Sequence, residues 1–178
     1  MPNPTLHTTA EDMSVDALIL SLIAASRQAS EDELQRIVTH LAQASFAPRL
    51  VRLTRWLRDQ LATRGVALQG DKVSAVEAHL LKRIHLDRQW PPDATADDYL
   101  ADLHRAMLHP AAQVWTYRYY GEPMIGFLSP SHMQNVPSPQ PFIFVAYNPR
   151  YGAIVTGYQA SGPDAIFIDG FEQVRKQR

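Results

Sequence analysis

Four polar side chains in two distant stretches could carry chemistry together. The stretch HLLKR holds His79 and Arg83 one helical turn apart, and the stretch TGY ends a predicted strand with Thr156 and Tyr158. An imidazole exchanges a proton near neutral pH, and a guanidinium binds phosphate through a planar fork of N–H donors. Together with two hydroxyls, they suffice to cleave RNA without a metal. A base removes the 2′-hydroxyl proton, donors stabilise the five-coordinate phosphorus, and an acid protonates the leaving 5′ oxygen.

Each stretch also has an interpretation without chemistry. The histidine–arginine pair falls at the border of the apolar stripe of its predicted helix, where amphipathic side chains commonly edge a core. Threonine and tyrosine are good strand formers. Regular alternation would place Ile154, Thr156 and Tyr158 on one face of the strand and Gly157 on the other. A glycine there would let another element approach that second face closely.

Other kinds of site find little support in the sequence. The chain has no cysteine, which excludes disulfides and thiolate chemistry, and it has no His-Glu-x-x-His motif or glycine-rich phosphate loop. We therefore predict neither a metal nor a cofactor. Four arginines recur every three residues beside Trp56, so this segment could follow a phosphate backbone or form a solvated helix face; they are Arg49, Arg52, Arg55 and Arg58.

Composition places the chain among soluble globular proteins. It has 178 residues, 46% of them apolar and 20% charged, with a formal net charge of -1. Attraction to nucleic acid or to anionic lipid would therefore need a local basic patch. The apolar run at 18–25 is far shorter than a membrane span and follows acidic residues, whereas a signal peptide has basic residues there. We expect a cytoplasmic protein without membrane contact.

Helices that could position the histidine dominate the first half of the chain. Apolar residues at helical spacing predict a helix that begins near Val15, and a third helix is expected to start at Pro48. Capping-box patterns, in which an acidic residue follows Ser or Thr by three positions, predict three more helices after Ser30, Ser74 and Thr95.

The second half changes to the two-residue period of strands. A hairpin is predicted at 114–128 and another at 142–161, and the loop between them, at 129–141, contains four prolines. A short strand is expected at 165–169, followed by a charged tail. The predicted fold is α+β, with N-terminal helices followed by a small antiparallel sheet made of two hairpins and a short last strand.

The domain boundary is left open between two arrangements. In the first, residues 1–68 form a helical extension of an α+β core at 69–178, with the glycine-containing segment RGVALQGD as the joint. In the second, the whole chain is one continuous domain.

The order of these motifs resembles the RelE/barnase/EndoU-like superfamily of metal-independent RNase toxins and related uncharacterised domains. The resemblance rests on HLLKRIHLDRQW, on a helix ending in LHP and on IFVAYNPRYGAIVTGY, and it covers about residues 72–160. It implies a toxin-like endoribonuclease with RNA as partner. His79 would be the acid/base, Arg83 a phosphate ligand, and Thr156 and Tyr158 active-site donors. The loop at 129–141 and the residues after 160 lie outside this pattern.

Two interpretations without catalysis remain beside this one. The chain could be an α+β module that binds a ligand or a protein through the aromatic residues of the first hairpin, Trp115, Tyr117, Tyr119 and Tyr120. Alternatively, its N-terminal helices could dock a protein partner or a second copy of the chain. The distance from His79 to Thr156 and Tyr158 distinguishes the catalytic interpretation from these two, because concerted chemistry needs direct or water-bridged contact.

Overall fold

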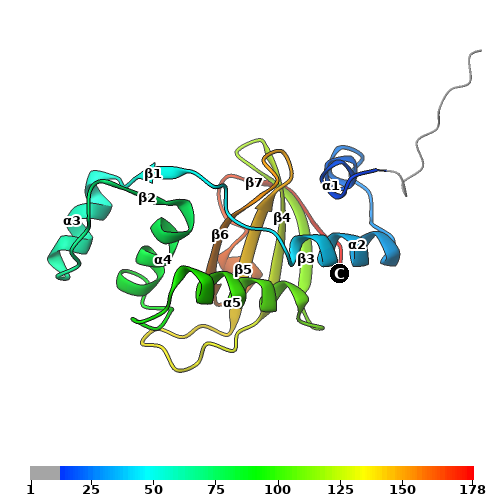
Figure 1. Cartoon of the computed structure of the whole chain (residues 1–178). Coiled ribbons are helices and arrows are strands. Elements are labelled where there is room, and N and C mark those ends of the chain that lie inside the picture. The colour runs from blue at the N-terminus through cyan, green and yellow to red at the C-terminus, as the bar shows by residue number, and fades with distance from the viewer. Residues whose placement is uncertain (1–12) are drawn as a thin grey trace, which may run out of the picture.

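The computed structural model describes residues 13–178, which form an α+β fold (Figure 1). The helices in this part are α1 (Val15–Ala24), α2 (Glu31–Leu41), α3 (Arg55–Thr63), α4 (Ala75–His85) and α5 (Ala96–Leu108). A two-stranded antiparallel sheet pairs β1 (Leu50–Arg52) with β2 (Lys72–Ser74). A five-stranded antiparallel sheet has the order β6-β5-β4-β3-β7 and comprises β3 (Gln113–Tyr119), β4 (Glu122–Pro130), β5 (Phe142–Asn148), β6 (Ala153–Ala160) and β7 (Phe171–Lys176). The α+β class is confirmed, with two sheets in place of the one expected.

The three predicted capping boxes are present. The side chains of Ser30, Ser74 and Thr95 each accept a hydrogen bond from the backbone three residues later, and the acidic side chain there accepts one in return. These reciprocal bonds satisfy backbone N–H groups that have no partner inside the helix. They set where α2, α4 and α5 begin.

The third predicted helix starts later than expected. Residues 50–52 form strand β1, and α3 begins at Arg55 after Thr54, whose hydroxyl accepts a hydrogen bond from the Leu57 amide. The leucine spacing in this segment fits a helix, but pairing with β2 holds 50–52 extended. A distant partner has overridden the local pattern.

The last strand also lies elsewhere. A short 3₁₀ helix occupies Pro163–Ala165, and the strand is β7, in the segment expected to be a charged tail. β7 pairs with β3 at the edge of the sheet, and most of its residues are exposed. An edge strand with solvated side chains carries no apolar alternation, which explains why the sequence pattern missed it.

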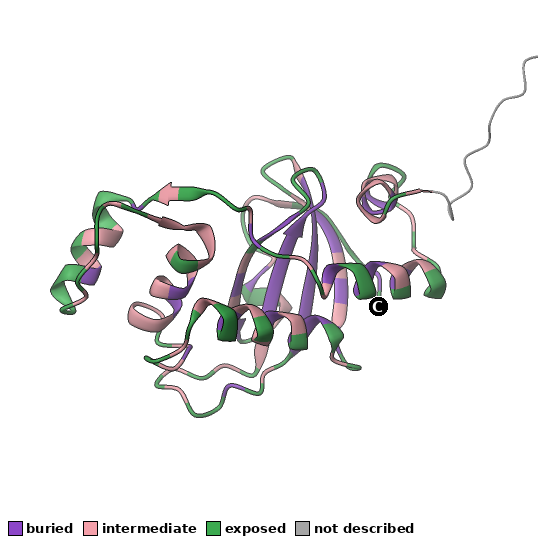
Figure 2. Ribbon diagram, in the orientation of Figure 1, coloured by how far each residue is buried: buried purple, intermediate pink, exposed green. Residues whose placement is uncertain are grey.

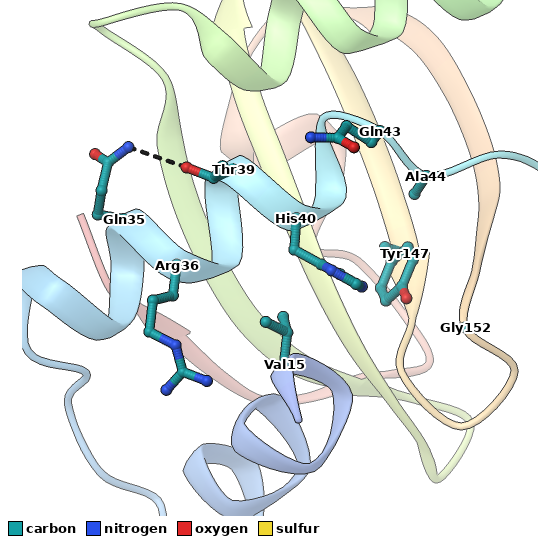
Figure 3. Close-up of a pocket in the computed structure, with 9 residues that line it drawn as sticks. All are labelled: Val15, Gln35, Arg36, Thr39, His40, Gln43, Ala44, Tyr147 and Gly152. Carbon is teal, nitrogen blue, oxygen red and sulfur yellow. Dashed lines mark hydrogen bonds between the residues drawn. The ribbon is translucent and has the colours of Figure 1, made fainter. Parts of the chain in front are cut away.

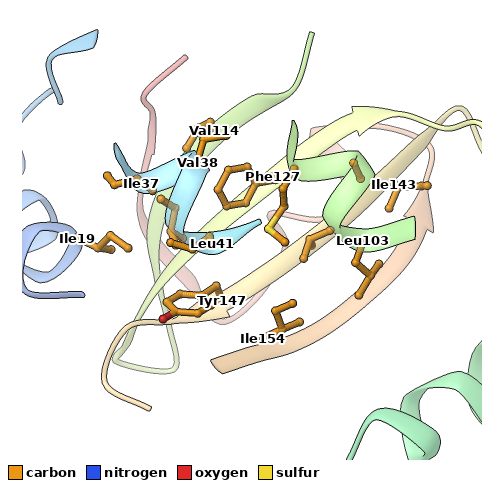
Figure 4. Packing of buried hydrophobic residues seen from close by; sticks show 14 of the residues in the cluster. Ile19, Ile37, Val38, Leu41, Leu103, Val114, Phe127, Ile143, Tyr147 and Ile154 are labelled. Atoms are coloured by element: carbon orange, nitrogen blue, oxygen red, sulfur yellow. The ribbon is translucent and has the colours of Figure 1, made fainter. Parts of the chain in front are cut away.

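One core cluster joins the helices to the sheet. Leu18 and Ile19 of α1 and Leu41 of α2 belong to the same buried cluster as Leu103 of α5 and Phe127 of β4 (Figure 4). The central strands β4 and β5 of the five-stranded sheet are largely buried, whereas α3 and the small sheet lie to one side of it (Figure 2). The cluster thus contains side chains from both sides of residue 68; the division of the chain into domains stays a prediction.

A β-bulge changes which face of β6 each residue occupies. Ala146 pairs with Thr156 while the next residue, Tyr147, pairs with Ile154, so Val155 is the extra residue. Ile154 belongs to the core under the helices, whereas Tyr158 packs on the opposite face of the sheet. The expectation that Ile154 shares a face with Thr156 is therefore wrong.

Candidate active site

Helix α4 lies beside the free edge of β6 and brings the four predicted side chains together. The Nδ1 atom of His79 is 3.3 Å from Oγ1 of Thr156. A terminal N–H of Arg83 donates to the same hydroxyl at 3.1 Å, and the guanidinium lies over the ring of Tyr158, 5.2 Å from its centroid. His79 thus reaches Thr156 directly, as concerted chemistry requires, and no hydrogen bond joins it to Tyr158 within residues 13–178.

The N–H donors of Arg83 already bond to other groups of the protein. Its side chain is 8% exposed, Nε donates to the Gly157 carbonyl at 2.8 Å, and Nη1 pairs with the Asp87 carboxylate one helical turn later. The carboxylate compensates the positive charge, and three donors of the fork are already in use. This arrangement fits a residue that positions β6 and Thr156 better than a phosphate ligand.

The same contacts close the open edge of the sheet. The Gly157 carbonyl also accepts from the buried Tyr99 hydroxyl at 2.6 Å. Two residues further on, the side-chain amide of Gln89 accepts from the Gln159 amide at 3.0 Å and donates to its carbonyl at 2.9 Å. Side chains thereby replace a neighbouring strand, which protects an edge that could otherwise pair with another chain.

The hydrogen bonds at Thr156 determine how His79 can act. Because Arg83 can only donate, it uses one lone pair of the Thr156 oxygen. If Thr156 donates to Nδ1 of His79, the imidazole carries its proton on Nε2 and acts as a donor. If Nδ1–H donates to Thr156, the oxygen accepts twice and Nε2 keeps a lone pair. A base on the far side of the ring requires the second tautomer.

His79 lines a cavity of about 620 Å³. Residues 45–51 run beside the start of β6, where the Ile154 amide donates to the Ser45 carbonyl at 2.8 Å, and they form one wall. Phe46 packs against the imidazole with ring centroids 5.3 Å apart. Arg49 and the largely exposed Tyr151 also contribute to the lining.

Burial keeps the imidazole neutral. It lowers the pKa of His79 from 6.5 to about 4, and the positive charges of Arg83 and Lys82 act in the same direction. At neutral pH the ring is therefore unprotonated and able to accept a proton.

The other three predicted residues lie outside the lining of this cavity. Among the described residues, the lining of this cavity includes His79 but not Thr156, Arg83 or Tyr158. Burial raises the pKa of the Tyr158 phenol, whose ring packs edge-on against Phe144. A molecule in the cavity would meet His79 first, with Thr156 and Arg83 acting through it.

Three residues that sequence reasoning missed complete the arrangement. Asp87 follows Arg83 by four positions, a spacing that favours a pair on a helix, so it was open to prediction. Tyr99 lies one turn before Leu103 on the apolar face of α5, which indicates burial but not its bond to Gly157. Nothing in the local sequence places Phe46 against the histidine.

A second cavity, of about 640 Å³, lies between α1, α2 and the β5–β6 turn (Figure 3). His40 points toward Tyr147 there, but the Tyr147 hydroxyl donates to Asp16 at 2.7 Å and the Gln35 amide donates to Thr39. In the part of the chain that the structure describes, no hydrogen bond holds the His40 ring in one orientation, as Thr156 does for His79. His79 therefore marks the better candidate for chemistry.

Two observations bear on the alternative interpretations. Tyr117 is buried and Tyr120 is 73% exposed, so the aromatic residues of the first hairpin do not form one surface. The apolar faces of α1 and α2 are buried in the core, which leaves no large apolar face on them for a partner.

Within residues 13–178, no helix is long and apolar enough to cross a membrane, and no cluster of three or more His, Cys, Asp or Glu side chains could hold a metal.

Comparison of the chain with protein-family models, with curated proteins and with solved structures finds no match.

Proposed function

We propose that this protein is a metal-independent endoribonuclease in which His79 is the catalytic base. The observation that carries the proposal is a neutral imidazole that lines a cavity while its other nitrogen is held by the Thr156 hydroxyl. A base must be unprotonated, oriented and in reach of substrate. The lowered pKa of His79, its contact with Thr156 and its place in the cavity wall support these three conditions, and the proposal takes the tautomer with its proton on Nδ1.

The reaction needs no nucleophile from the protein. Nε2 of His79 takes the proton of a ribose 2′-hydroxyl, and that oxygen attacks the adjacent phosphorus. The bond from phosphorus to the 5′ oxygen breaks, leaving a 2′,3′-cyclic phosphate. We assign protonation of the departing 5′ oxygen to the imidazolium so formed, because His79 is the only histidine of the described residues that lines this cavity.

We assign contact with the phosphate to Arg49. It lines the cavity, whereas Arg83 is turned toward β6 and paired with Asp87. A bound phosphate beside His79 would also raise the pKa of the imidazole, because a nearby negative charge favours the protonated form. Substrate binding thus strengthens a base whose pKa in the free protein is about 4.

The test is cleavage of labelled, mixed-sequence RNA in excess EDTA by the parent protein and by two variants. We expect fragments with 2′,3′-cyclic phosphate ends from the parent and from His85→Ala, and none from His79→Ala. His85 is the matched control because it lies on the same helix outside this cavity. Equal cleavage by His79→Ala would remove this residue from the mechanism.

A non-catalytic module that binds a ligand in the same cavity is the second candidate. It is favoured by the position of Thr156, Arg83 and Tyr158, which do not line the cavity. Binding of RNA or of single nucleotides that His79→Ala weakens, without any cleavage by the parent protein, would support this alternative over the enzyme.

A further inference from the structure

Positive charge is concentrated in one projecting part of the molecule. Residues 49–72, which we call the basic arm, contain β1, α3 and the start of β2 and lie to one side of the main sheet (Figure 1). The basic arm carries six Lys or Arg and two Asp, a net charge of +4, while the remaining residues carry 11 Lys or Arg and 16 Asp or Glu, a net charge of -5. The near-neutral total hides this division.

Ion pairs within the basic arm neutralise only part of its positive charge. Its two carboxylates pair with two of the arginines, Arg52 with Asp71 at 3.1 Å and Arg55 with Asp59 at 3.9 Å. The other cations of the basic arm have no carboxylate partner among residues 13–178; they are Arg49, Arg58, Arg64 and Lys72.

The pairing of β1 with β2 places two positive charges opposite each other. Arg52 lies directly opposite Lys72 in the β1–β2 pairing, and both are exposed. Like charges at directly opposed positions destabilise a sheet. Asp71 compensates Arg52, so Lys72 is the cation of this pair that is left for an anionic partner.

Two further features indicate what kind of anion fits. Trp56 lies among these arginines with 60% of its surface exposed, and aromatic side chains beside cations are typical of surfaces that bind single-stranded nucleic acid by stacking. In addition, Arg49 and Val51 line the cavity that holds His79. The root of the basic arm is therefore part of the candidate active site.

We propose that the basic arm binds the phosphate backbone of single-stranded RNA and leads that strand into the His79 cavity. The second half of this statement rests on the proposed function, whereas the first half does not. Cations of the arm contact successive phosphates, Trp56 stacks on a base, and Arg49 holds the phosphate that enters the cavity.

The test measures RNA binding in a His79→Ala background, so that the strand stays intact. A fluorescently labelled 20-nucleotide RNA of mixed sequence is titrated at several salt concentrations with the full chain and with two triple variants. The arm variant carries Arg55→Gln, Arg58→Gln and Arg64→Gln, which leaves Arg49 of the candidate active site in place. The control variant carries Arg105→Gln, Arg150→Gln and Arg175→Gln, which removes the same charge from the rest of the protein.

The expected result is a selective loss in the arm variant. Each phosphate contact on a single strand contributes about 0.7 to the slope of log affinity against log salt, so three lost contacts lower the slope by about 2 and the affinity at 0.1 M salt by about 100-fold. The control variant should keep the slope of the parent. Circular dichroism and thermal unfolding of each variant identify any loss of fold.

Equal losses in both triple variants would overturn the proposal, because binding would then follow total charge and not the basic arm. Tighter binding of polyglutamate than of RNA, with the same dependence on the arm, would also overturn it in favour of an acidic protein partner. Cleavage is scored separately with the catalytically intact chain. RNA that binds through the arm but is not cut refutes the enzyme alone, and RNA that is cut without dependence on the arm refutes the arm alone.

Discussion

Gly157 offers the sharpest test of how the site is assembled. A Cβ atom at this position would lie 2.4 Å from Cδ2 and 2.7 Å from Cδ1 of Leu103, and real Cβ atoms essentially never approach another heavy atom within 3.0 Å. Leu103 is fully buried in α5, so its side chain has little room to move. The glycine between Thr156 and Tyr158 thus lets α5 pack directly on β6.

The expected cost follows from this clash. Overpacking a close-packed core typically costs about 1–3 kcal/mol, which we expect for Gly157→Ala. Leu103→Ala should cost about 2–5 kcal/mol through the cavity that it leaves. In the double variant the new methyl group fills part of that cavity. We therefore expect the double variant to lose less stability than the sum of the two single losses, by about 1–3 kcal/mol.

Urea unfolding of the parent, the two single variants and the double variant measures this coupling directly. Gly162→Ala is the matched control, because Gly162 has an extended backbone with φ of 162° and an added methyl group there would meet open space. It should change the free energy of unfolding by less than about 0.5 kcal/mol. Strict additivity of Gly157→Ala and Leu103→Ala would refute the claim that close approach of α5 is what requires the glycine.

Two further predictions concern the charges around His79. Its pKa is lowered from an ordinary value of 6.5 to about 4 in the folded protein, so the unfolded chain binds more protons between these limits and stability should fall as pH decreases from 6.5 to 4, by at most about 3 kcal/mol. Urea unfolding at pH 4.5 and 7.5 should show this loss in the parent but not in His79→Gln, and equal losses in both would contradict it. Asp87→Asn leaves the buried Arg83 without its carboxylate and should cost about 1–3 kcal/mol, less than for a fully buried pair because Asp87 is 28% exposed. An NMR titration of that variant should also show a further lowered His79 pKa; an unchanged value would mean that Arg83 does not act on the imidazole.

The parts of the fold that were predicted are those set by neighbouring residues. The capping boxes at Ser30, Ser74 and Thr95 are local patterns, and each begins a helix where expected. Strand β1 was missed because its extended form depends on β2, some twenty residues later. β7 was misplaced because an exposed edge strand has no apolar pattern of its own.

The candidate site likewise has features that the sequence predicted and features that depend on distant residues. Residue types and a family resemblance selected His79, Arg83, Thr156 and Tyr158, and the structure brings them together. Their separate environments were only partly predictable. The spacing of four residues favours the Arg83–Asp87 pair, whereas the bulge at Val155 depends on the register with β5. These details move Arg83 from a phosphate ligand toward a positioning residue and leave His79 facing the cavity.

The closure of the β6 edge explains why Arg83 and Tyr99 converge on Gly157, but it does not explain His79. Arg83 and Tyr99 satisfy a backbone carbonyl that would otherwise be buried without a partner, which is sufficient reason for both. Within residues 13–178, the His79 ring makes no hydrogen bond to a backbone group. It bonds to the Thr156 hydroxyl, which already has Arg83 as partner, and its burial disfavours its own charged form. A leucine could pack beside Phe46 in this position and leave the Thr156 hydroxyl with Arg83 as its partner. Satisfaction of a backbone carbonyl thus accounts for Arg83 and Tyr99 but not for the imidazole, and this is the strongest reason to look for its purpose in chemistry.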